Sequence, residues 1–279
     1  MKRGNGGRYV HRPTGENPLR ILIAGLVGLL FGAFGAAEGQ EANIFKILKL
    51  EGHQVRWQVP RDGNPRVVTY QLANGAIEFS SARNCRKITS LEELISASQI
   101  DATTLRSELA AAFAMWEAAA NITFREVSEG TRADILIGAQ MEPEGWAFAD
   151  VFYDIASSEP IKPISRALVC LNPLRRWKVG FDGDLKKYDL RYTFAHEIGH
   201  AIGLDHPGGG EQIMGYRYEE HFRTLQSGDI RGAVTLYGEA RHAGVPEIQS
   251  GPNQTRVPGY SVRRFAKRWG TRGFNARSP

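Results

Sequence analysis

The sequence is poor in cysteine, because only Cys85 and Cys170 occur among 279 residues. Two cysteines exclude a small scaffold that many disulfides hold together. The chain also lacks an extreme composition: charged residues make up 23% and hydrophobic residues 42%. These values exclude a fully disordered or collagen-like chain. We find no internal repeat, and the length allows one or two domains of ordinary size.

The middle of the chain lacks an excess of positive charge. Residues 38–240 hold 22 basic and 28 acidic residues, whereas residues 1–37 carry a net charge of +4 and residues 241–279 one of +7. A body that binds nucleic acid would carry its basic patch on the folded surface. We therefore expect no nucleic-acid partner.

The first 37 residues have the pattern of an export signal. Five basic residues precede an apolar and glycine-rich run at 21–37, and Gly35 and Ala37 supply small residues before a cleavage site at Glu38. The alternative is an uncleaved membrane anchor, because the run is near the lower limit of about 17–25 residues for a spanning helix. In both cases we expect the body to lie outside the cytoplasm, secreted, periplasmic or anchored, after a short segment at 38–45.

Strand and helix patterns alternate through the body at 46–240, which predicts an α/β or α+β domain of roughly 190–200 residues. Runs of β-branched and apolar residues predict the strands, and apolar periodicity with capping residues predicts the helices. The predicted strands are 66–72, 133–138 and 166–171, and the predicted helices are 102–120, 190–202 and 229–237. The remaining residues, 241–279, are rich in Pro, Gly and Arg and have no hydrophobic period. They predict a disordered solvated tail, with contact to an anionic surface as the alternative.

One helix carries the spacing of a metal site. His196 and His200 lie one turn apart on the same helix face, so that two imidazoles can hold one ion. Gly203 can adopt a left-handed conformation, end the helix and bring His206 back as a third ligand. Three neutral imidazoles suit zinc and leave the fourth position open for water, which is the pattern of a catalytic zinc site.

Glu197 and Met214 complete the pattern. Glu197 follows the first histidine, so we expect its carboxylate to reach a zinc-bound water, whose pKa zinc lowers to about 7, and to take its proton as general base. Met214 comes eight residues after the third histidine, which indicates a Met-turn under the metal. Ordinary core packing is the alternative for this methionine.

The motif from Phe194 to His206 resembles the active-site helix of the matrixins, a branch of the metzincin metalloproteases. The resemblance covers about 46–240 and is nearer to bacterial members than to vertebrate ones. It implies an α+β metzincin catalytic domain: a twisted mixed five-stranded sheet, two long helices at the cleft, and a small C-terminal subdomain with the Met-turn and the last helix. Further segments agree in order, namely 115–117, 122–124, 133–137, 229–232 and 236–238.

The resemblance also implies an activity. It predicts an exported metalloendopeptidase that cleaves internal peptide bonds of a polypeptide lying along an edge strand, as a monomer with one catalytic zinc ion. The implied site residues are the ligands His196, His200 and His206, the base Glu197, and the structural residues Gly203, Met214 and Asp229. A catalytically silent, zinc-stabilised binding module is the alternative, although three histidines alone would suffice for it and Glu197 would have no role.

The chain departs from the matrixin pattern in several places. The Pro-Arg-Cys-Gly latency motif is missing, and residues 145–150 contain no histidine that would bind a second, structural zinc ion. Gly228 stands where vertebrate matrixins have the first of two consecutive aspartates, which puts a salt bridge from a trimmed N-terminus in doubt. Residues 182–184, Asp-Gly-Asp, predict either a calcium loop or a solvated turn.

Three further residues carry open alternatives. Tyr216 matches a tyrosine that astacins and serralysins use near the metal, where it stabilises the oxyanion or binds zinc at rest; the alternative is a tyrosine packed in the pocket wall. Cys85 and Cys170 allow one disulfide in an exported protein, which would tie an insertion at about 74–100 to the sheet. The alternative for Cys85 is a thiolate that blocks the zinc.

Overall fold

The structure is a computed structural model that describes residues 45–208 and 211–241. The signal or anchor predicted at 1–37 and all of the basic tail except its first residue lie outside these ranges. Within them, no helix is both long enough and apolar enough to cross a membrane.

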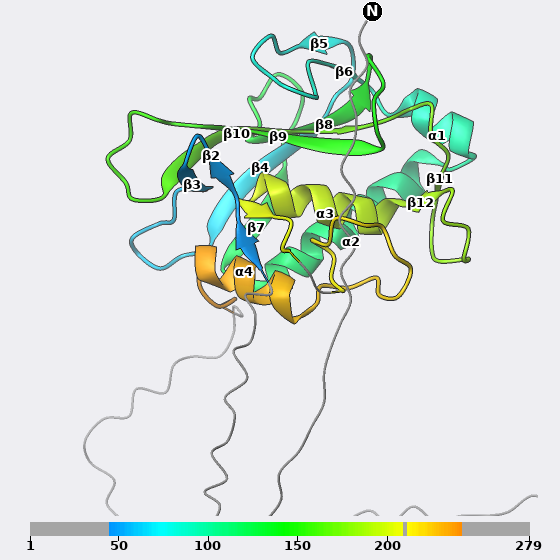
Figure 1. The fold of residues 1–279 in the computed structure, drawn as a ribbon. Coiled ribbons are helices and arrows are strands. Elements are labelled where there is room, and N and C mark those ends of the chain that lie inside the picture. The colour runs from blue at the N-terminus through cyan, green and yellow to red at the C-terminus, as the bar shows by residue number, and fades with distance from the viewer. Residues whose placement is uncertain (1–44, 209–210, 242–279) are drawn as a thin grey trace, which may run out of the picture. The chain divides into compact units, whose positions relative to one another are not determined.

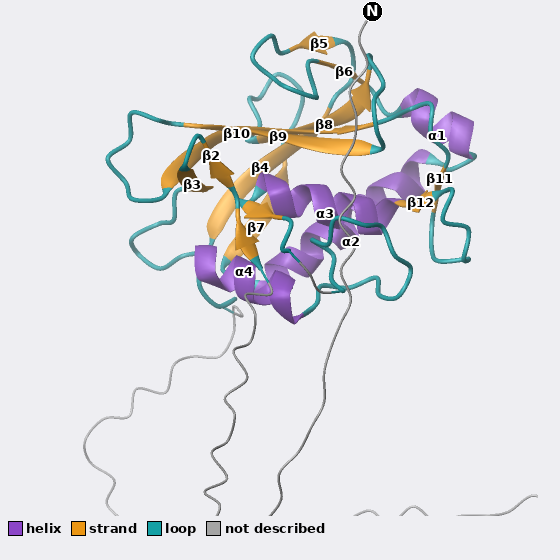
Figure 2. Cartoon of the chain, in the orientation of Figure 1, coloured by secondary structure: helices purple, strands orange, loops and turns teal. Residues whose placement is uncertain are grey.

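Within the described residues, four helices and five longer strands make up most of the fold, arranged as Figures 1 and 2 show. The helices are α1 (Glu92–Ser98), α2 (Ala102–Ala119), α3 (Leu190–Ala201) and α4 (Ser227–Tyr237). The longer strands are β4 (Arg66–Leu72), β7 (Ile122–Glu126), β8 (Ile135–Gln140), β9 (Ala147–Tyr153) and β10 (Lys162–Leu171). The short strands are β1 (Lys46–Ile47), β2 (Lys49–Leu50), β3 (His53–Arg56), β5 (Ile77–Glu78), β6 (Lys87–Thr89), β11 (Trp177–Lys178), β12 (Tyr188–Asp189) and β13 (Leu204–Asp205).

The five longer strands form one mixed sheet in the order β7-β4-β8-β10-β9. The strands β7, β4, β8 and β10 run parallel to one another, and β9 pairs antiparallel with β10 at the edge. The short strand β3 pairs parallel with β10, and the short strand β6 pairs antiparallel with β8. The expected α+β fold with a five-stranded mixed sheet is therefore confirmed, with short strands extending it.

Different parts of the chain cover the two faces of this sheet. Helices α2 and α3 lie together on one face (Figure 1), where the Trp116 indole N–H donates a 3.0 Å hydrogen bond to the Ala195 carbonyl and joins them. The other face has a smaller core of its own under the insertion. Its buried members are Ala73, Ala82, Cys85, Ile88, Leu168 and Cys170. The insertion is therefore a packed part of the domain, and it contains the β5–β6 hairpin and α1, which the sequence patterns did not predict.

Helix starts agree closely with the sequence prediction. Asp101 caps α2 by accepting the Thr104 backbone N–H at 2.8 Å, and Asp189 caps α3 by accepting that of Tyr192 at 2.9 Å. Each cap satisfies one of the backbone donors that a helix leaves free at its first turn. Strand ends agree less well: β10 begins at Lys162, four residues before the predicted start, because it pairs there with β3 and β9.

Candidate metal centre

Helix α3 presents two histidines on one side, one turn apart. The Nε2 atoms of His196 and His200 lie 3.2 Å from one another, and both side chains are half-buried. The opposite side of the helix is packed into the main core through residues such as Phe194 and Ile198. Because that packing fixes the rotation of the helix, the two imidazoles face away from the core.

The chain turns back directly after α3. Gly203 has a φ of +102°, and a Cβ atom there would lie 2.3 Å from the Val55 carbonyl oxygen, so that only glycine fits. The next two residues form β13, which pairs with β1 and ends immediately before His206. The Nε2 atom of His206 thereby lies 3.0 Å from that of His196 and 3.2 Å from that of His200. The structure thus brings the three predicted histidines together.

Backbone carbonyls orient two of these rings. The Nδ1 atom of His196 lies 2.7 Å from the Ile213 carbonyl oxygen, and that of His200 lies 2.8 Å from the Leu204 carbonyl oxygen. A carbonyl only accepts, so the proton is on Nδ1 and the lone pair of each Nε2 points to the shared centre. This is the arrangement that a metal-binding histidine needs.

The histidine nitrogens fit a metal ion in charge and in spacing. Burial lowers the pKa of His200 to about 4 and that of His196 well below its ordinary value, and burial lowers the pKa of His206 as well. The imidazoles are therefore neutral at pH 7, as ligation requires. Tetrahedral ligands about 2.0–2.1 Å from zinc lie about 3.3 Å apart, close to the observed separations. The three histidines can hold one metal ion.

Glu197 lies on α3 beside the first histidine and lines a cleft that also contains the three histidines. The side chain is buried, and this desolvation, together with the negative charge of Asp150, raises the pKa of Glu197 to about 8. A cation at the histidines would act in the opposite direction and favour the carboxylate form. A carboxyl group in this position can exchange a proton near neutral pH.

Met214 lies under the histidine helix, where Gly199 makes room for it. A Cβ atom on Gly199 would lie 2.2 Å from the Met214 sulfur and 2.9 Å from the Trp116 ring. The sequence patterns did not predict this role of Gly199. The signal was present, because a glycine inside a helix costs about 1 kcal/mol relative to alanine and therefore indicates a close approach.

Asp229 of α4 holds the turn that contains Met214. Its buried carboxylate accepts the backbone N–H groups of Ile213 and Met214, both at 3.0 Å, and that of Gln226 at 2.8 Å. The carbonyl of Ile213 is the group that orients His196. Asp229 therefore connects the last helix to the orientation of a histidine ring.

A cleft of about 1070 Å³ lies over the three histidines. Its walls come from β9, β2, α3 and the segment after Met214. Tyr216 stands on the rim with 82% of its surface exposed, and its ring is nearly perpendicular to that of His206 at a centroid distance of 5.2 Å. The three predicted histidines, Glu197 and Tyr216 thus line one cleft.

Comparison with known families agrees with this geometry. Residues 89–238, more than half of the chain, match the peptidase M10 family, matrixin. The chain belongs to the matrixin family. Among curated relatives, stromelysin-2 of Rattus norvegicus is 27% identical over 205 residues, which cover 69% of this chain and 41% of that protein. Interstitial collagenase of Sus scrofa is 26% identical over 204 residues, covering 71% and 40%. This matrixin thus spans about two fifths of the length of these relatives.

The Asp-Gly-Asp loop of this matrixin surrounds a lysine. The Lys178 ammonium contacts the Asp182 carboxylate, lies 2.9 Å from the Asp184 carbonyl oxygen and forms a 2.5 Å ion pair with Glu220. The Lys178 and Glu220 side chains are only 9% and 8% exposed. A calcium ion at these oxygen atoms would have to displace the ammonium group.

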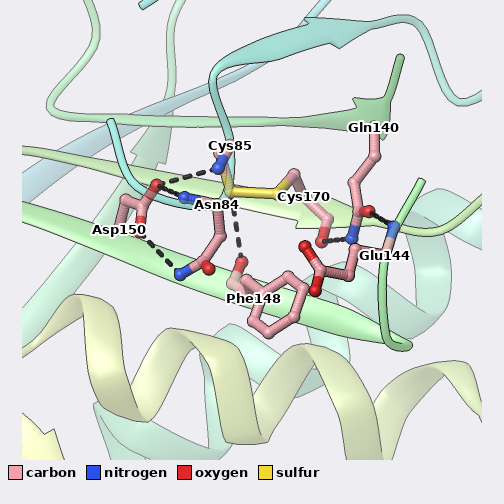
Figure 3. Close-up of a disulfide and its surroundings, with 7 residues drawn as sticks. All are labelled: Asn84, Cys85, Gln140, Glu144, Phe148, Asp150 and Cys170. Atoms are coloured by element: carbon pink, nitrogen blue, oxygen red, sulfur yellow. Dashed lines mark hydrogen bonds between the residues drawn. A yellow bond between two sulfur atoms is a disulfide. The ribbon is translucent and has the colours of Figure 1, made fainter. Parts of the chain in front are cut away.

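Cys85 and Cys170 form a disulfide in the structure (Figure 3). Both residues are fully buried in the core beneath the insertion, and the bond joins the insertion to β10. Cys85 therefore carries no free thiolate that could reach the histidines, which overturns the zinc-blocking alternative.

Proposed function

We propose that this matrixin is an exported zinc-dependent endopeptidase that hydrolyses internal peptide bonds. The observation that carries the proposal is the meeting of three neutral imidazoles in a cleft that also contains the carboxyl group of Glu197. Membership of the matrixin family supports it. We further propose that the catalytic domain spans 46–240 and acts as a monomer, outside the cytoplasm, after removal of residues 1–37 or anchored by them.

In this proposal His196, His200 and His206 hold a single zinc ion. When bound, zinc supplies Lewis acidity that polarises a carbonyl group and lowers the pKa of a water molecule. Glu197 takes the proton of the attacking water and passes it to the leaving amine, which is general acid–base work for a carboxyl group that lines the same cleft. Calcium at 182–184 stays a prediction. We also keep the prediction of a single zinc ion, although a second, mostly exposed group that could hold a metal ion is formed by Glu211, Glu219 and His221.

In this proposal the edge strand β9 and Tyr216 contact the substrate. Among the described strands β9 pairs only with β10, so its other edge has free backbone groups along the cleft. An extended polypeptide can add to such an edge as a further strand. Tyr216, exposed beside His206, either donates a hydrogen bond to the oxyanion, binds zinc at rest, or forms the pocket wall.

Removal of the metal tests this function. We expect a chelator to abolish cleavage of casein or gelatin, and one equivalent of zinc to restore it, because the three imidazoles provide the ligands of the reactive centre. The measurements are the rate of fluorescent peptide release and the zinc content per chain. A wild-type protein that holds equimolar zinc yet cleaves neither protein would instead be a zinc-stabilised binding module.

The zinc content is expected to fall in acid. Ligation needs neutral imidazoles, and the lowered pKa values place their protonation below the ordinary value of 6.5, at about 4 for His200. Protons therefore compete with zinc once the pH falls below the ordinary imidazole range, because each protonated imidazole is lost as a ligand. Zinc content after dialysis at a series of pH values measures this, and undiminished zinc at about pH 4 would contradict it.

A further inference from the structure

The insertion reaches the cleft as well as covering the sheet. Residues 81–84, which we name the wall segment, line the same 1070 Å³ cleft as His196 and Glu197. The segment lies between the β5–β6 hairpin strands. The β9 side chains Phe148 and Phe152 pack into the core beneath the insertion, whereas Ala149 and Val151 pack into the main core. The wall segment therefore stands on the opposite side of β9 from the histidine helix.

Buried polar groups hold the wall segment in place. Asp150 of β9 is only 8% exposed, and its carboxylate accepts the backbone N–H groups of Asn84 and Cys85, both at 2.8 Å, and the Asn84 side-chain amide at 3.0 Å. Figure 3 shows these bonds beside the disulfide to Cys170. A carboxylate bonded three times and a buried disulfide give this segment a fixed position at the cleft.

Arg83 is the charged residue of the wall segment, and it lines the cleft. Its side chain is exposed, and it has no ion pair in 45–208 or 211–241. Four acidic residues also line the cleft. Asp150 is engaged by the wall segment and Asp205 by a 2.5 Å ion pair with Lys46, whereas Glu197 lies beside the histidines. Glu51 accepts a 2.8 Å hydrogen bond from the Tyr153 hydroxyl.

A second cation lines the cleft. Lys49 of β2 is exposed, lines the same cleft and has no ion pair within the described part of the chain. Arg83 and Lys49 are thus two cations at the cleft that form no ion pair within the described residues. Opposite charges brought together during association increase both the rate and the selectivity of binding.

We propose that the wall segment is a specificity element and that Arg83 selects substrates with a glutamate or aspartate side chain near the cleaved bond. The inference rests on the proposed peptidase function. The planar guanidinium of Arg83 can bind a carboxylate through two parallel hydrogen bonds, and the wall segment holds Arg83 at the cleft that β9 also lines, where an extended peptide would lie.

A peptide library with Glu, Gln or Lys at each position around the cleaved bond tests the inference. We expect wild type to prefer Glu over Lys at one position by about three- to ten-fold in kcat/KM, and Arg83→Glu to reverse that preference. Arg86→Glu is the matched control, because Arg86 belongs to the same insertion but is paired with Glu142 at 3.3 Å and does not line the cleft. It should leave the preference unchanged.

The two proposals can fail separately. If wild type cleaves peptides but Arg83→Glu retains the wild-type preference, the role of Arg83 is wrong and the peptidase function stands. Binding of the same peptides to Glu197→Ala, measured by fluorescence anisotropy, gives a second readout that needs no hydrolysis. If this variant binds Glu and Lys peptides equally well, the specificity proposal is overturned whatever the activity of the wild type.

Discussion

A Glu197→Gln variant is expected to lose about 10²–10⁴-fold in kcat while it still binds one zinc ion. Glutamine preserves the size of the side chain but accepts no proton at neutral pH. Glu197 is buried at the cleft beside the three histidines, and bulk water has little access to replace it. Cleavage of a fluorogenic peptide and the zinc content per chain are the two measurements.

Glu129→Gln is the control for this experiment, because Glu129 is exposed and lies in the turn after β7, away from the cleft. We expect it to match wild type in both measurements. A Glu197→Gln protein with wild-type kcat and equimolar zinc would remove Glu197 from the chemistry and leave the three histidines as a binding site alone. Loss of zinc together with activity would mean that the variant had disturbed α3 itself.

An Asp229→Ala variant is expected to lower the free energy of unfolding by about 3–5 kcal/mol, because it removes the acceptor of three backbone N–H groups. The change leaves the backbone N–H groups of Ile213 and Met214 without their buried acceptor, and each unsatisfied buried donor costs about 1–3 kcal/mol. The Ile213 carbonyl that orients His196 would then move more freely. We therefore also expect a 10- to 100-fold loss of zinc affinity, the usual effect of removing a group that orients a ligand. Urea unfolding and a competitive zinc titration measure the two effects.

Asp62→Ala provides the comparison, since the Asp62 carboxylate also accepts a nearby backbone N–H, from Asn64 at 3.0 Å, but lies on the surface. Its loss should change the free energy of unfolding far less than Asp229→Ala does, because water replaces the lost acceptor. Equal destabilisation by the two variants would show that burial of Asp229 contributes nothing to the turn. An unchanged zinc affinity in Asp229→Ala would separate the turn from the orientation of His196.

Local patterns predicted the part of the site that one helix and its end determine. The spacing of His196 and His200 needs only the helical repeat, and Gly203 marks the one residue able to make the close turn after it. The caps at Asp101 and Asp189 were likewise readable, because a cap depends on residues within one turn.

Strand β9 could not be recognised in the same way. The alternation that identifies a strand depends on one face being wet. Here Phe148 and Phe152 pack into the core under the insertion, and Ala149 and Val151 pack against the helices, so that apolar residues occur on both faces. The short apolar run was consequently not assigned, although it forms the edge of the cleft.

Residue types at short range predicted the three histidines, Glu197 and the methionine beneath them, and the resemblance of that motif to the matrixins selected the α+β fold class. The contacts between distant segments are visible only in the folded protein: Asp150 with Asn84, Lys178 with Glu220, and the insertion with the cleft. The Lys178–Glu220 and Asn84–Asp150 partners lie 42 and 66 residues apart, and no periodic sequence pattern connects residues at such separations. Their contact follows from the packing of two separate cores on opposite faces of one sheet.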